Sequence, residues 1–393
     1  MTNIPYNRQK IEQDDISAVV EVLESDYLTT GPYVKGFENE LVNYTGVNNA
    51  VSCCNGTAAL HLSMMSLGIG EGDAVIVPAI TFLSSANAPR FCGAEVIFCD
   101  VDPETGLITS ETMEECLANI DIKSNTPKAV VPVHLGGQCC DMKSIGEVAK
   151  NNNLKIVEDA SHSLGAYYLD GEGSDDYVGN CKYSDLTTFS FHPIKSITTG
   201  EGGMISTNDD DLASSLAALR NHGIEKDTIN DINLNEPWHY EINKLAPNYR
   251  LSDIQCALGM SQIKKLNYFV KRRKQIAELY NSLIAPYQPI LKPVKHVEYC
   301  YSAWHLYQVL IDFKSLGIER GAVMKTLAEK GIGTQVHYIP VNTQPYYKRR
   351  YGVHRLEGAD YFYNRTLSLP MYVDLKDSEV HEVVSNLTVI LNI

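Results

Sequence analysis

The feature that most constrains this chain is an alternation of short β-branched runs with helix-like segments between about residues 46 and 208. In order, the runs are NAVSCC, DAVIVPAITF, AEVIFCDV, KAVVPVHL, KIVEDA, LTTFSF and GGMISTN. Strands separated by helices are typical of sheets that are mostly parallel and covered on both faces. We therefore predict an α/β fold on a mixed, mostly parallel sheet of seven strands.

Helices are expected between these strands and before them. The segments TAALHLSMMSLG and DMKSIGEVAKNNN predict crossover helices, the second with Asp141 as its N-cap. Near the N-terminus, EQDDISAVVEVLESD places Ile16, Val19, Val20 and Leu23 on one helical face. We expect that face to pack against the larger domain.

The pattern changes after about residue 208, which indicates a second domain. The polar stretch IEKDTINDINLNEPWHYEIN is expected to be an exposed loop. Ser252 and Gln255 then form a capping-box pattern that opens a long helix, expected to reach Leu283, with KRRK at 271–274 on a solvated face. Beyond it, SAWHLYQVLI and TQVHYIP predict strands and RGAVMKTLAEKG predicts a helix. We therefore divide the chain into a large α/β domain, residues 1–245, and a smaller α+β domain with a long linking helix, residues 246–393.

Charge and hydropathy exclude several classes of protein. Lys and Arg total 33 and Asp and Glu total 48, so the formal charge is −15, which excludes a basic nucleic-acid footprint. The longest apolar runs, such as 129–133 and 74–82, fall far short of the roughly 20 residues that span a membrane. The start, MTNIPYNRQK, lacks the apolar core of a signal peptide. We expect a cytoplasmic protein without nucleic-acid or membrane partners.

The ten cysteines are scattered, and none forms a CxxC pair. Several stand where a small apolar residue would, for example Cys99 in EVIFCDV and Cys256 in IQCALGM. Such positions indicate reduced core thiols in a reducing compartment. We therefore expect no metal site.

Lys195 is the first candidate for chemistry. It follows a predicted strand in SFHPIKSITTGEGG and stands just before a glycine-rich turn. Its apolar neighbours Phe191, Ile194 and Ile197 would partly desolvate the amine, lower its pKa and make it a nucleophile toward a carbonyl. The alternative is a structural lysine that caps a turn, and the residues described next favour the nucleophile.

Asp159 ends the predicted strand in KIVEDASHSLG, where open α/β sheets bind their ligands. Together with a nucleophilic lysine, this carboxylate suits pyridoxal phosphate, because it would keep the pyridine nitrogen protonated and the ring an electron sink. His162 follows three residues later. It is either a hydrogen-bond partner near the phenolic oxygen of the cofactor or a satisfied structural histidine.

A phosphate cradle and a stacking residue complete the candidate site. In SCCNGTAALHL a strand turns at Asn55, Gly56 and Thr57 into a helix, whose first amides and the Thr57 hydroxyl can hold a phosphate. Ser190 offers a second hydroxyl. Phe82, at the end of PAITF, either stacks on the cofactor ring or is an ordinary core phenylalanine.

Taken together, these residues resemble the DegT/DnrJ family of pyridoxal-phosphate-dependent sugar aminotransferases, which has the aspartate-aminotransferase-like fold (type I). The resemblance spans nearly the whole chain, and its most specific parts are LTTGP at 28–32, NGTAAL at 55–60, PAITFLSSANA at 78–88, EDASHSLG at 158–165, SFHPIKSITTGEGG at 190–203 and NYRLSDIQCALG at 248–259. HPIKSITTGEGG and GIGTQVHYIP look like the branch that aminates a UDP-linked 4-keto sugar in the pseudaminic acid pathway.

The resemblance implies roles for individual residues. Lys195 would bond the cofactor covalently, Asp159 would bind the pyridine nitrogen, and Ser190, Gly56 and Thr57 would hold the phosphate. Asn248 matches an asparagine that reaches the phosphate from the partner subunit, which implies a homodimer with shared sites. Residues near the substrate would be Tyr6, Thr29, His192, Arg250 and His337.

The implied reaction transfers an amino group from L-glutamate, through the pyridoxamine phosphate form of the cofactor, to the C4 ketone of a nucleotide-linked 4-keto-6-deoxy hexose. The acceptor that the branch implies is UDP-2-acetamido-2,6-dideoxy-β-L-arabino-hex-4-ulose. Alternatives are a dTDP- or GDP-linked 4-keto or 3-keto hexose and a non-catalytic cofactor-binding regulator. Lysine at 195 argues against a sugar 3-dehydratase, and the buried-type cysteines argue against a desulfurase. The Cys53–Cys54 and Cys139–Cys140 pairs and the acidic segment 224–240 depart from the family pattern.

Overall fold

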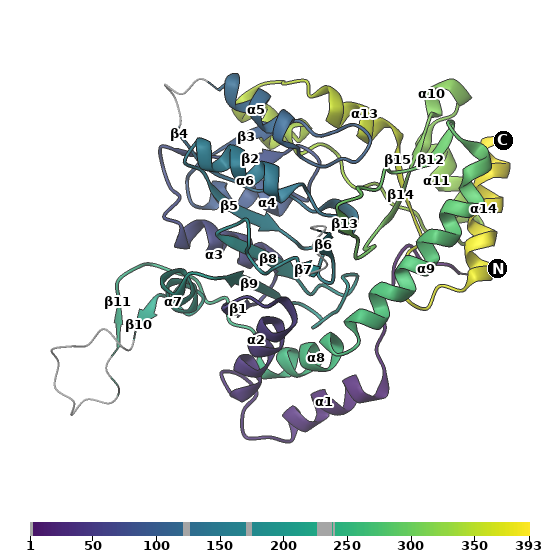
Figure 1. Ribbon diagram of the computed structural model, residues 1–393. Coiled ribbons are helices and arrows are strands. Elements are labelled where there is room, and N and C mark those ends of the chain that lie inside the picture. The colour runs from purple at the N-terminus through teal and green to yellow at the C-terminus, as the bar shows by residue number, and fades with distance from the viewer. Residues whose placement is uncertain (1–2, 121–125, 170–174, 226–237, 239) are drawn as a thin grey trace.

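The computed structural model describes residues 3–120, 126–169, 175–225, 238 and 240–393 of the chain. A large α/β layer occupies one side of Figure 1, a smaller α+β layer occupies the other, and the long helix α9 (Leu266–Ile284) runs between them. The expected exposed loop at 224–243 lies largely outside the described residues, but its described ends are not loop, because they pair as the short strands β10 (Ile224–Glu225) and β11 (Glu241–Ile242). No helix in the described ranges is long and apolar enough to cross a membrane.

The central sheet has seven strands, as predicted. Its order is β1 (Asn49–Cys53), β9 (Gly203–Thr207), β8 (Leu186–Ser190), β5 (Lys155–Asp159), β4 (Thr126–Val130), β2 (Asp73–Pro78) and β3 (Glu95–Cys99). The pairs from β8 to β3 are parallel, and β9 runs antiparallel to both of its neighbours. The sheet is therefore mixed and mostly parallel.

Both faces of this sheet are buried, which explains why its strands are continuous apolar runs rather than alternating ones. Ile76, Val130 and Ile156 belong to one hydrophobic cluster, and Val75 and Val157 belong to the cluster on the opposite face. The helices of this domain are α2 (Pro32–Thr45), α3 (Gly56–Ser66), α4 (Leu83–Phe91), α5 (Ser110–Ala118), α6 (Met142–Asn151) and α7 (Asp210–Leu219). Asp141 caps α6 by accepting the Ser144 amide at 3.2 Å, as predicted.

A second, antiparallel sheet of three strands forms the smaller layer. Its order is β12 (Leu291–Pro293), β14 (Tyr307–Ile311) and β15 (Thr366–Leu369), and it shares a hydrophobic cluster with α9, α11 (Arg320–Glu329) and α14 (Asp377–Leu391). Ile4 joins this cluster through a backbone bridge to Ile332. The start of the chain therefore packs with the C-terminal layer, while the boundary at residue 245 stays a prediction.

The remaining elements are short and lie around the two layers. They are β6 (Tyr167–Leu169), β7 (Asp175–Tyr177), β10 (Ile224–Glu225), β11 (Glu241–Ile242), β13 (Cys300–Tyr301), α10 (Phe313–Leu316), α12 (Pro345–Tyr351) and α13 (Glu357–Arg365). Within the described ranges, three 3-10 turns occupy Leu135–Gly137, Ala285–Tyr287 and Val341–Thr343.

The N-terminal helix α1 (Gln13–Leu23) forms where expected but presents a different face. Ile16, Val20 and Leu23 are 49%, 42% and 55% exposed, so the prediction that they pack against the larger domain was wrong. Asp15 turns inward instead and accepts hydrogen bonds from Ser261, Gln262 and Lys265 at 2.6–2.8 Å. A buried carboxylate must be paired, so these donors set the rotation of α1.

The predicted long helix is two helices. The capping box of Ser252 and Gln255 is present at 3.3 and 3.1 Å and opens α8 (Asp253–Ile263), but α9 begins separately at Leu266. The prediction that KRRK at 271–274 lies on a solvated face was also wrong in part, because Arg273 is only 2% exposed. Arg273 follows Phe269 by four residues and precedes Ile276 by three, so it lies on the apolar stripe of the helix.

The segment TQVHYIP is not a strand. Its pairing is limited to a bridge between Gln335 and Ser368, after which residues 336–339 run along the cavity described below. Likewise, only residues 307–311 of SAWHLYQVLI form a strand. His305, His337 and Tyr338 belong to the parts of these two segments that form no strand, and they lie close together near the cavity.

Candidate active site

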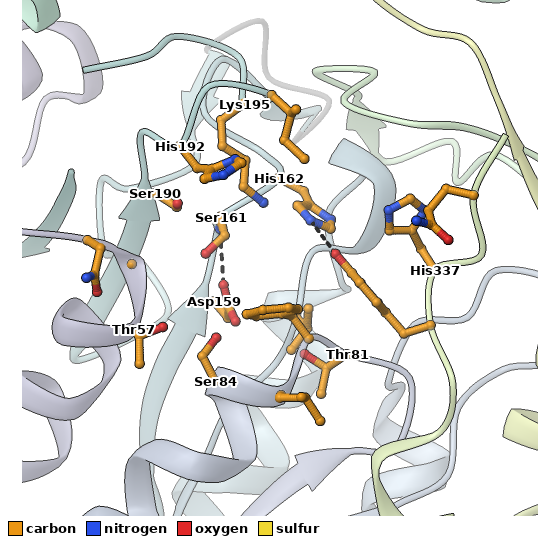
Figure 2. A pocket seen from close by; sticks show the side chains of 18 of the residues that line it. Thr57, Thr81, Ser84, Asp159, Ser161, His162, Ser190, His192, Lys195 and His337 are labelled. Carbon is orange, nitrogen blue, oxygen red and sulfur yellow. Dashed lines mark hydrogen bonds between the residues drawn. The ribbon is translucent and has the colours of Figure 1, made fainter. Parts of the chain in front are cut away.

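The main cavity, of about 670 Å³, opens at the carboxyl ends of the parallel strands. Its lining includes Ser190 at the end of β8, Asp159 at the end of β5 and the residues that follow β1 and β2. Figure 2 shows Thr57 and Ser190 on one side of Asp159, His162 and His337 on the other, and Lys195 between them. Ligands of α/β sheets bind at this edge because the strand ends and helix starts meet there.

Lys195 lies on the turn after β8, which its amide closes by donating to the His192 carbonyl at 2.9 Å. Burial of the amine lowers the pKa of Lys195 to about 8, and the nearby Asp159 carboxylate opposes that change. A lysine with such a pKa is partly neutral near physiological pH and can therefore attack a carbonyl carbon.

Asp159 is held on both carboxylate oxygens. The Ser85 hydroxyl donates to Oδ2 at 2.7 Å and the Ser161 amide donates to Oδ1 at 3.1 Å, while Thr81 hydrogen-bonds Ser85 at 2.7 Å. These contacts fix the carboxylate at the floor of the cavity and keep it available as an acceptor.

Glu158, the preceding residue, points to the opposite face of β5, as strand alternation requires. It pairs with His134 at 2.7 Å and accepts the Thr187 hydroxyl at 3.0 Å and the Ser184 hydroxyl. Although burial acts to raise the pKa of Glu158, these partners, led by His134, hold it below its usual value. Glu158 is therefore buried on one face of β5, while Asp159 lies in the cavity.

The start of α3 forms a small cradle next to Ser190. Asn55 caps the helix by accepting the Ala58 amide at 2.8 Å, which leaves the first turn open toward the cavity. A Cβ atom at Gly56 would stand 2.8 Å from the Cβ of Ser190, so only glycine allows this approach. Amides at a helix start and the Thr57 and Ser190 hydroxyls are suitable ligands for a phosphate.

Histidine and tyrosine side chains line the side of the cavity away from this cradle. His162 Nε2 is 3.1 Å from the Tyr338 hydroxyl, and its Nδ1 accepts the Gly136 amide at 3.3 Å. His337 bonds the Tyr6 hydroxyl at 3.1 Å and Ser368 at 2.7 Å. Burial and nearby Lys195 lower the pKa of His337 to about 3 and that of His162 well below its usual value, so both rings stay neutral.

Ten of the thirteen residues predicted for the site line this cavity. They are Tyr6, Gly56, Thr57, Phe82, Asp159, His162, Ser190, His192, Lys195 and His337. Phe82 is not a core residue, because it is 53% exposed at the mouth. Sequence reasoning missed Ser85, Ser161 and Tyr338, although Ser85 follows Phe82 by one helical turn and Tyr338 directly follows His337.

Thr29, Asn248 and Arg250 do not line the cavity of their own chain. Thr29 bridges to Ser252 and Asn248 bridges to Asn221 through the backbone, while Arg250 donates to the side chain of Asn221. Asn248 is exposed, and the Nε of Arg250 is buried without a partner among the described residues. These three residues form a separate group beside the start of α8.

The cavity suits pyridoxal phosphate in three respects. It offers a partly neutral lysine for the aldehyde, a fixed carboxylate for the pyridine nitrogen and a helix-start cradle for the phosphate. All three face one cavity, which has the half-exposed ring of Phe82 at its mouth.

Comparisons with known proteins agree with this geometry. The model of the DegT/DnrJ/EryC1/StrS aminotransferase family matches residues 9–388. The spore coat polysaccharide biosynthesis protein SpsC of Bacillus subtilis (strain 168) is 38% identical over 388 residues, which cover 97% of this chain and 95% of SpsC.

Solved structures match over similar lengths. Helicobacter pylori PseC, an aminotransferase involved in the biosynthesis of pseudoaminic acid, has a TM-score of 0.89 at 28% identity, with all of both chains covered. The putative sugar aminotransferase Spr1654 from Streptococcus pneumoniae is 29% identical in both its PMP and its PLP forms. The PMP form has a TM-score of 0.89, with 99% of this chain and 99% of Spr1654 covered. The PLP form has a TM-score of 0.87, with 100% of this chain and 99% of Spr1654 covered.

Proposed function

This chain belongs to the DegT/DnrJ/EryC1/StrS aminotransferase family and is a sugar aminotransferase that uses pyridoxal phosphate, and on this basis we propose its substrates. The donor is L-glutamate, and the acceptor is the C4 ketone of UDP-2-acetamido-2,6-dideoxy-β-L-arabino-hex-4-ulose or a related nucleotide-linked 4-keto-6-deoxy hexose. The product belongs to pseudaminic acid or related amino-sugar biosynthesis. The similarity to PseC over the whole chain supports this acceptor.

The observation that carries the proposal is the pairing of Lys195 and Asp159 across one cavity. When bound, the cofactor would supply an electron sink that makes the Cα–H bond of the amino donor acidic. The amine of Lys195 would remove that proton as base and return it one position away as acid. In the second half of the reaction the same transfer in reverse would deliver a proton to C4 of the sugar, whose ketone carbon carries no hydrogen. Asp159, fixed by Ser85 and Ser161, would hold the pyridine nitrogen and stabilise the charge that develops there.

The experiment is an absorption and product assay. Wild-type protein loaded with pyridoxal phosphate should lose its visible band on addition of L-glutamate, and the UDP-linked keto sugar should restore it while an amino sugar forms. Lys195→Ala should bind the cofactor through the phosphate cradle and Asp159 without the visible band of the lysine linkage. It should also lose turnover by a factor of at least about 10³, because the proton-transfer group is missing. Turnover near the wild-type level in Lys195→Ala would refute the assignment.

A second acceptor class is favoured by a different observation. SpsC, whose name refers to spore coat polysaccharide, is more similar in sequence to this chain than PseC is. That name indicates a different end product from that of PseC, so another nucleotide sugar, a dTDP- or GDP-linked 4-keto or 3-keto hexose, is kept as the alternative acceptor. Parallel assays with UDP-, dTDP- and GDP-linked keto sugars distinguish the two, since the preferred acceptor should have the highest kcat/KM.

The enzyme is proposed to be a homodimer with shared sites. Asn248, Arg250 and Thr29 lie off the cavity of their own chain, so they can serve a site only across an interface. An apolar strip of Ile16, Val20, Leu23, Tyr27 and Leu28 is exposed next to Thr29, which bridges to Ser252 beside Arg250. We also expect the reaction in a reducing, cytoplasmic compartment, which the ten free cysteines support.

A further inference from the structure

Two buried cysteines meet where the two layers join, and the reaction derived above uses neither of them. Cys139 lies two residues after the 3-10 turn Leu135–Gly137 of the large layer. Cys300 is the first residue of β13, the short strand labelled next to β6 in Figure 1, from which the chain runs on into β14 of the smaller layer. Their Sγ atoms are 2.8 Å apart, although 161 positions separate the two residues in the chain.

The two sulfur atoms are close to bonding distance. An S–S bond is about 2.0 Å long, so a movement of less than about 1 Å would allow the bond to form. The Cys139 amide also donates to Cys300 Sγ at 3.0 Å, which holds the two residues face to face. The adjacent thiol of Cys140 is directed elsewhere, because its Sγ donates to the Val133 carbonyl at 3.3 Å and its amide donates to His134 at 3.1 Å. Cys139 is therefore the cysteine that Cys300 contacts.

The surroundings hold the pair in place and keep it reduced. Cys139 and Cys300 are 0% and 2% exposed, and the Ala303 amide donates to the Gly137 carbonyl at 2.9 Å, which fixes the turn before one cysteine against the chain after the other. Burial, together with the Cys300 thiol, raises the pKa of Cys139 well above its usual value. Because the thiolate is the reactive form, the pair stays reduced in a reducing compartment and reacts only with an added oxidant.

A small oxidant can come close to this pair. A cavity of about 30 Å³ lies beside it, lined by Gln138, the neighbour of Cys139, and by Ser302, two residues after Cys300. That volume holds a molecule of the size of water, and hydrogen peroxide is only slightly larger. The cysteines are not among the lining residues, so contact needs a small local opening. The position favours a small peroxide over a bulky disulfide or a second protein as the oxidant.

We propose that Cys139 and Cys300 are a redox modification site, at which hydrogen peroxide forms a disulfide that ties the two layers together. One thiolate attacks a peroxide oxygen, the O–O bond breaks, and a sulfenic acid and a hydroxide ion result. The second thiolate attacks the sulfenic sulfur, forms the S–S bond and expels its hydroxyl as a second hydroxide. The protons that the two thiols lost convert both hydroxides to water. One peroxide is thus reduced to two water molecules while two thiols are oxidised to one disulfide.

The disulfide has a measurable effect on stability. It would join the segment before α6 to β13 across 161 positions, and closing a long loop restricts the unfolded chain. The peroxide-treated enzyme should therefore have a Tm several degrees above that of the reduced enzyme. This effect is independent of the amino donor, the sugar and the homodimer.

The experiment is peptide mapping of the full-length, pyridoxal-phosphate-loaded enzyme before and after a series of hydrogen peroxide doses that ends with oxidation of the half-buried Cys54. Free thiols are blocked with N-ethylmaleimide during denaturation. Mass spectrometry should then find a peptide pair joined through Cys139 and Cys300 in the treated enzyme alone. Recovery of both cysteines as maleimide adducts at every dose, or a bond from Cys300 to Cys140, would overturn the proposal. The map uses the wild-type protein, so it does not require that any variant folds.

Thermal unfolding of three variants connects the bond with its effect. Cys139→Ala and Cys300→Ala should each abolish the increase in Tm that peroxide causes. Cys140→Ala is the matched control, because it removes an equally buried thiol at the next position that faces away from Cys300, and it should keep the increase. An increase that persists in Cys300→Ala, or an unchanged Tm in wild-type protein that carries the bond, would contradict the proposed tie between the layers. Failure of the proposed acceptor sugar would leave all of these measurements unaffected.

Discussion

At the scale of single residues, the environment of each ionisable group decides its role. Glu158 and Asp159 are neighbours in sequence, but strand alternation buries Glu158 against His134 and points Asp159 into the cavity. The role of Lys195 likewise depends on its burial, which lowers its pKa to about 8, although the nearby Asp159 acts to raise it.

The lowered pKa of Lys195 predicts how cofactor capture depends on pH. Only the neutral amine attacks the aldehyde, so the neutral fraction, and with it the rate of linkage formation, increases as pH rises and levels off above about 8. Stopped-flow absorption after mixing cofactor-free protein with pyridoxal phosphate from pH 6 to 10 measures this rate. Asp159→Asn removes the charge that opposes the shift, so the plateau should begin at a lower pH. A rate that still climbs steeply between pH 9 and 10 would mean that the lysine keeps its ordinary pKa.

At the scale of elements, a few buried polar contacts set how helices meet. Asp253, in the first turn of α8, is fully buried and accepts the amides of Gly31 and Tyr33 at 2.7 and 2.9 Å. Those amides belong to the start of α2, so one carboxylate joins two helix starts. The same principle rotates α1 through Asp15 and holds α9 through Arg273, which donates to the carbonyls of Trp304, His305 and Met371.

Removal of the Asp253 carboxylate should therefore lower the free energy of unfolding more than removal of an exposed helix cap does. Asp253→Ala leaves two amides without an acceptor in a buried place, and we expect a loss of about 2–4 kcal/mol of stability. Asp209, the exposed N-cap of α7, accepts two amides in the same way, but Asp209→Ala should cost only about 1 kcal/mol because water replaces the lost acceptor. Urea denaturation followed by circular dichroism compares the two, and equal midpoints for both variants would contradict the role given to Asp253.

At the scale of the whole molecule, the cavity is assembled from distant parts of the chain. Tyr6 from the N-terminal arm, Asp159 and Lys195 from the large layer and His337 from the C-terminal layer line the same space. The group of Thr29, Asn248 and Arg250 is missing from that lining, which is compatible with the proposal, based on the match of Asn248 to the family, that they serve the site of a partner subunit.

Mixing two inactive variants tests the shared site. If Asn248 serves the partner's cofactor, Lys195→Ala and Asn248→Ala protein, unfolded and refolded together, should form hybrid dimers in which one site has both native residues. That mixture should regain activity that neither variant has alone. As a control, each variant refolded alone should stay inactive. A mixture no more active than its parents, or a wild-type protein that is monomeric by light scattering, would contradict the dimer proposal.

The seven-stranded sheet and the caps at Asp141 and Ser252 could be predicted from the sequence because they depend on local patterns, namely apolar runs and capping residues. Ten of the thirteen predicted site residues line the cavity, and they came from short motifs at strand ends and from the family resemblance. Three features became visible only in the folded molecule: the rotation of α1, the burial of Arg273 and the place of Tyr338 beside His162. Each of these depends on hydrogen bonds between residues far apart in the chain. A periodic pattern cannot encode such bonds, since they exist only once the layers have packed.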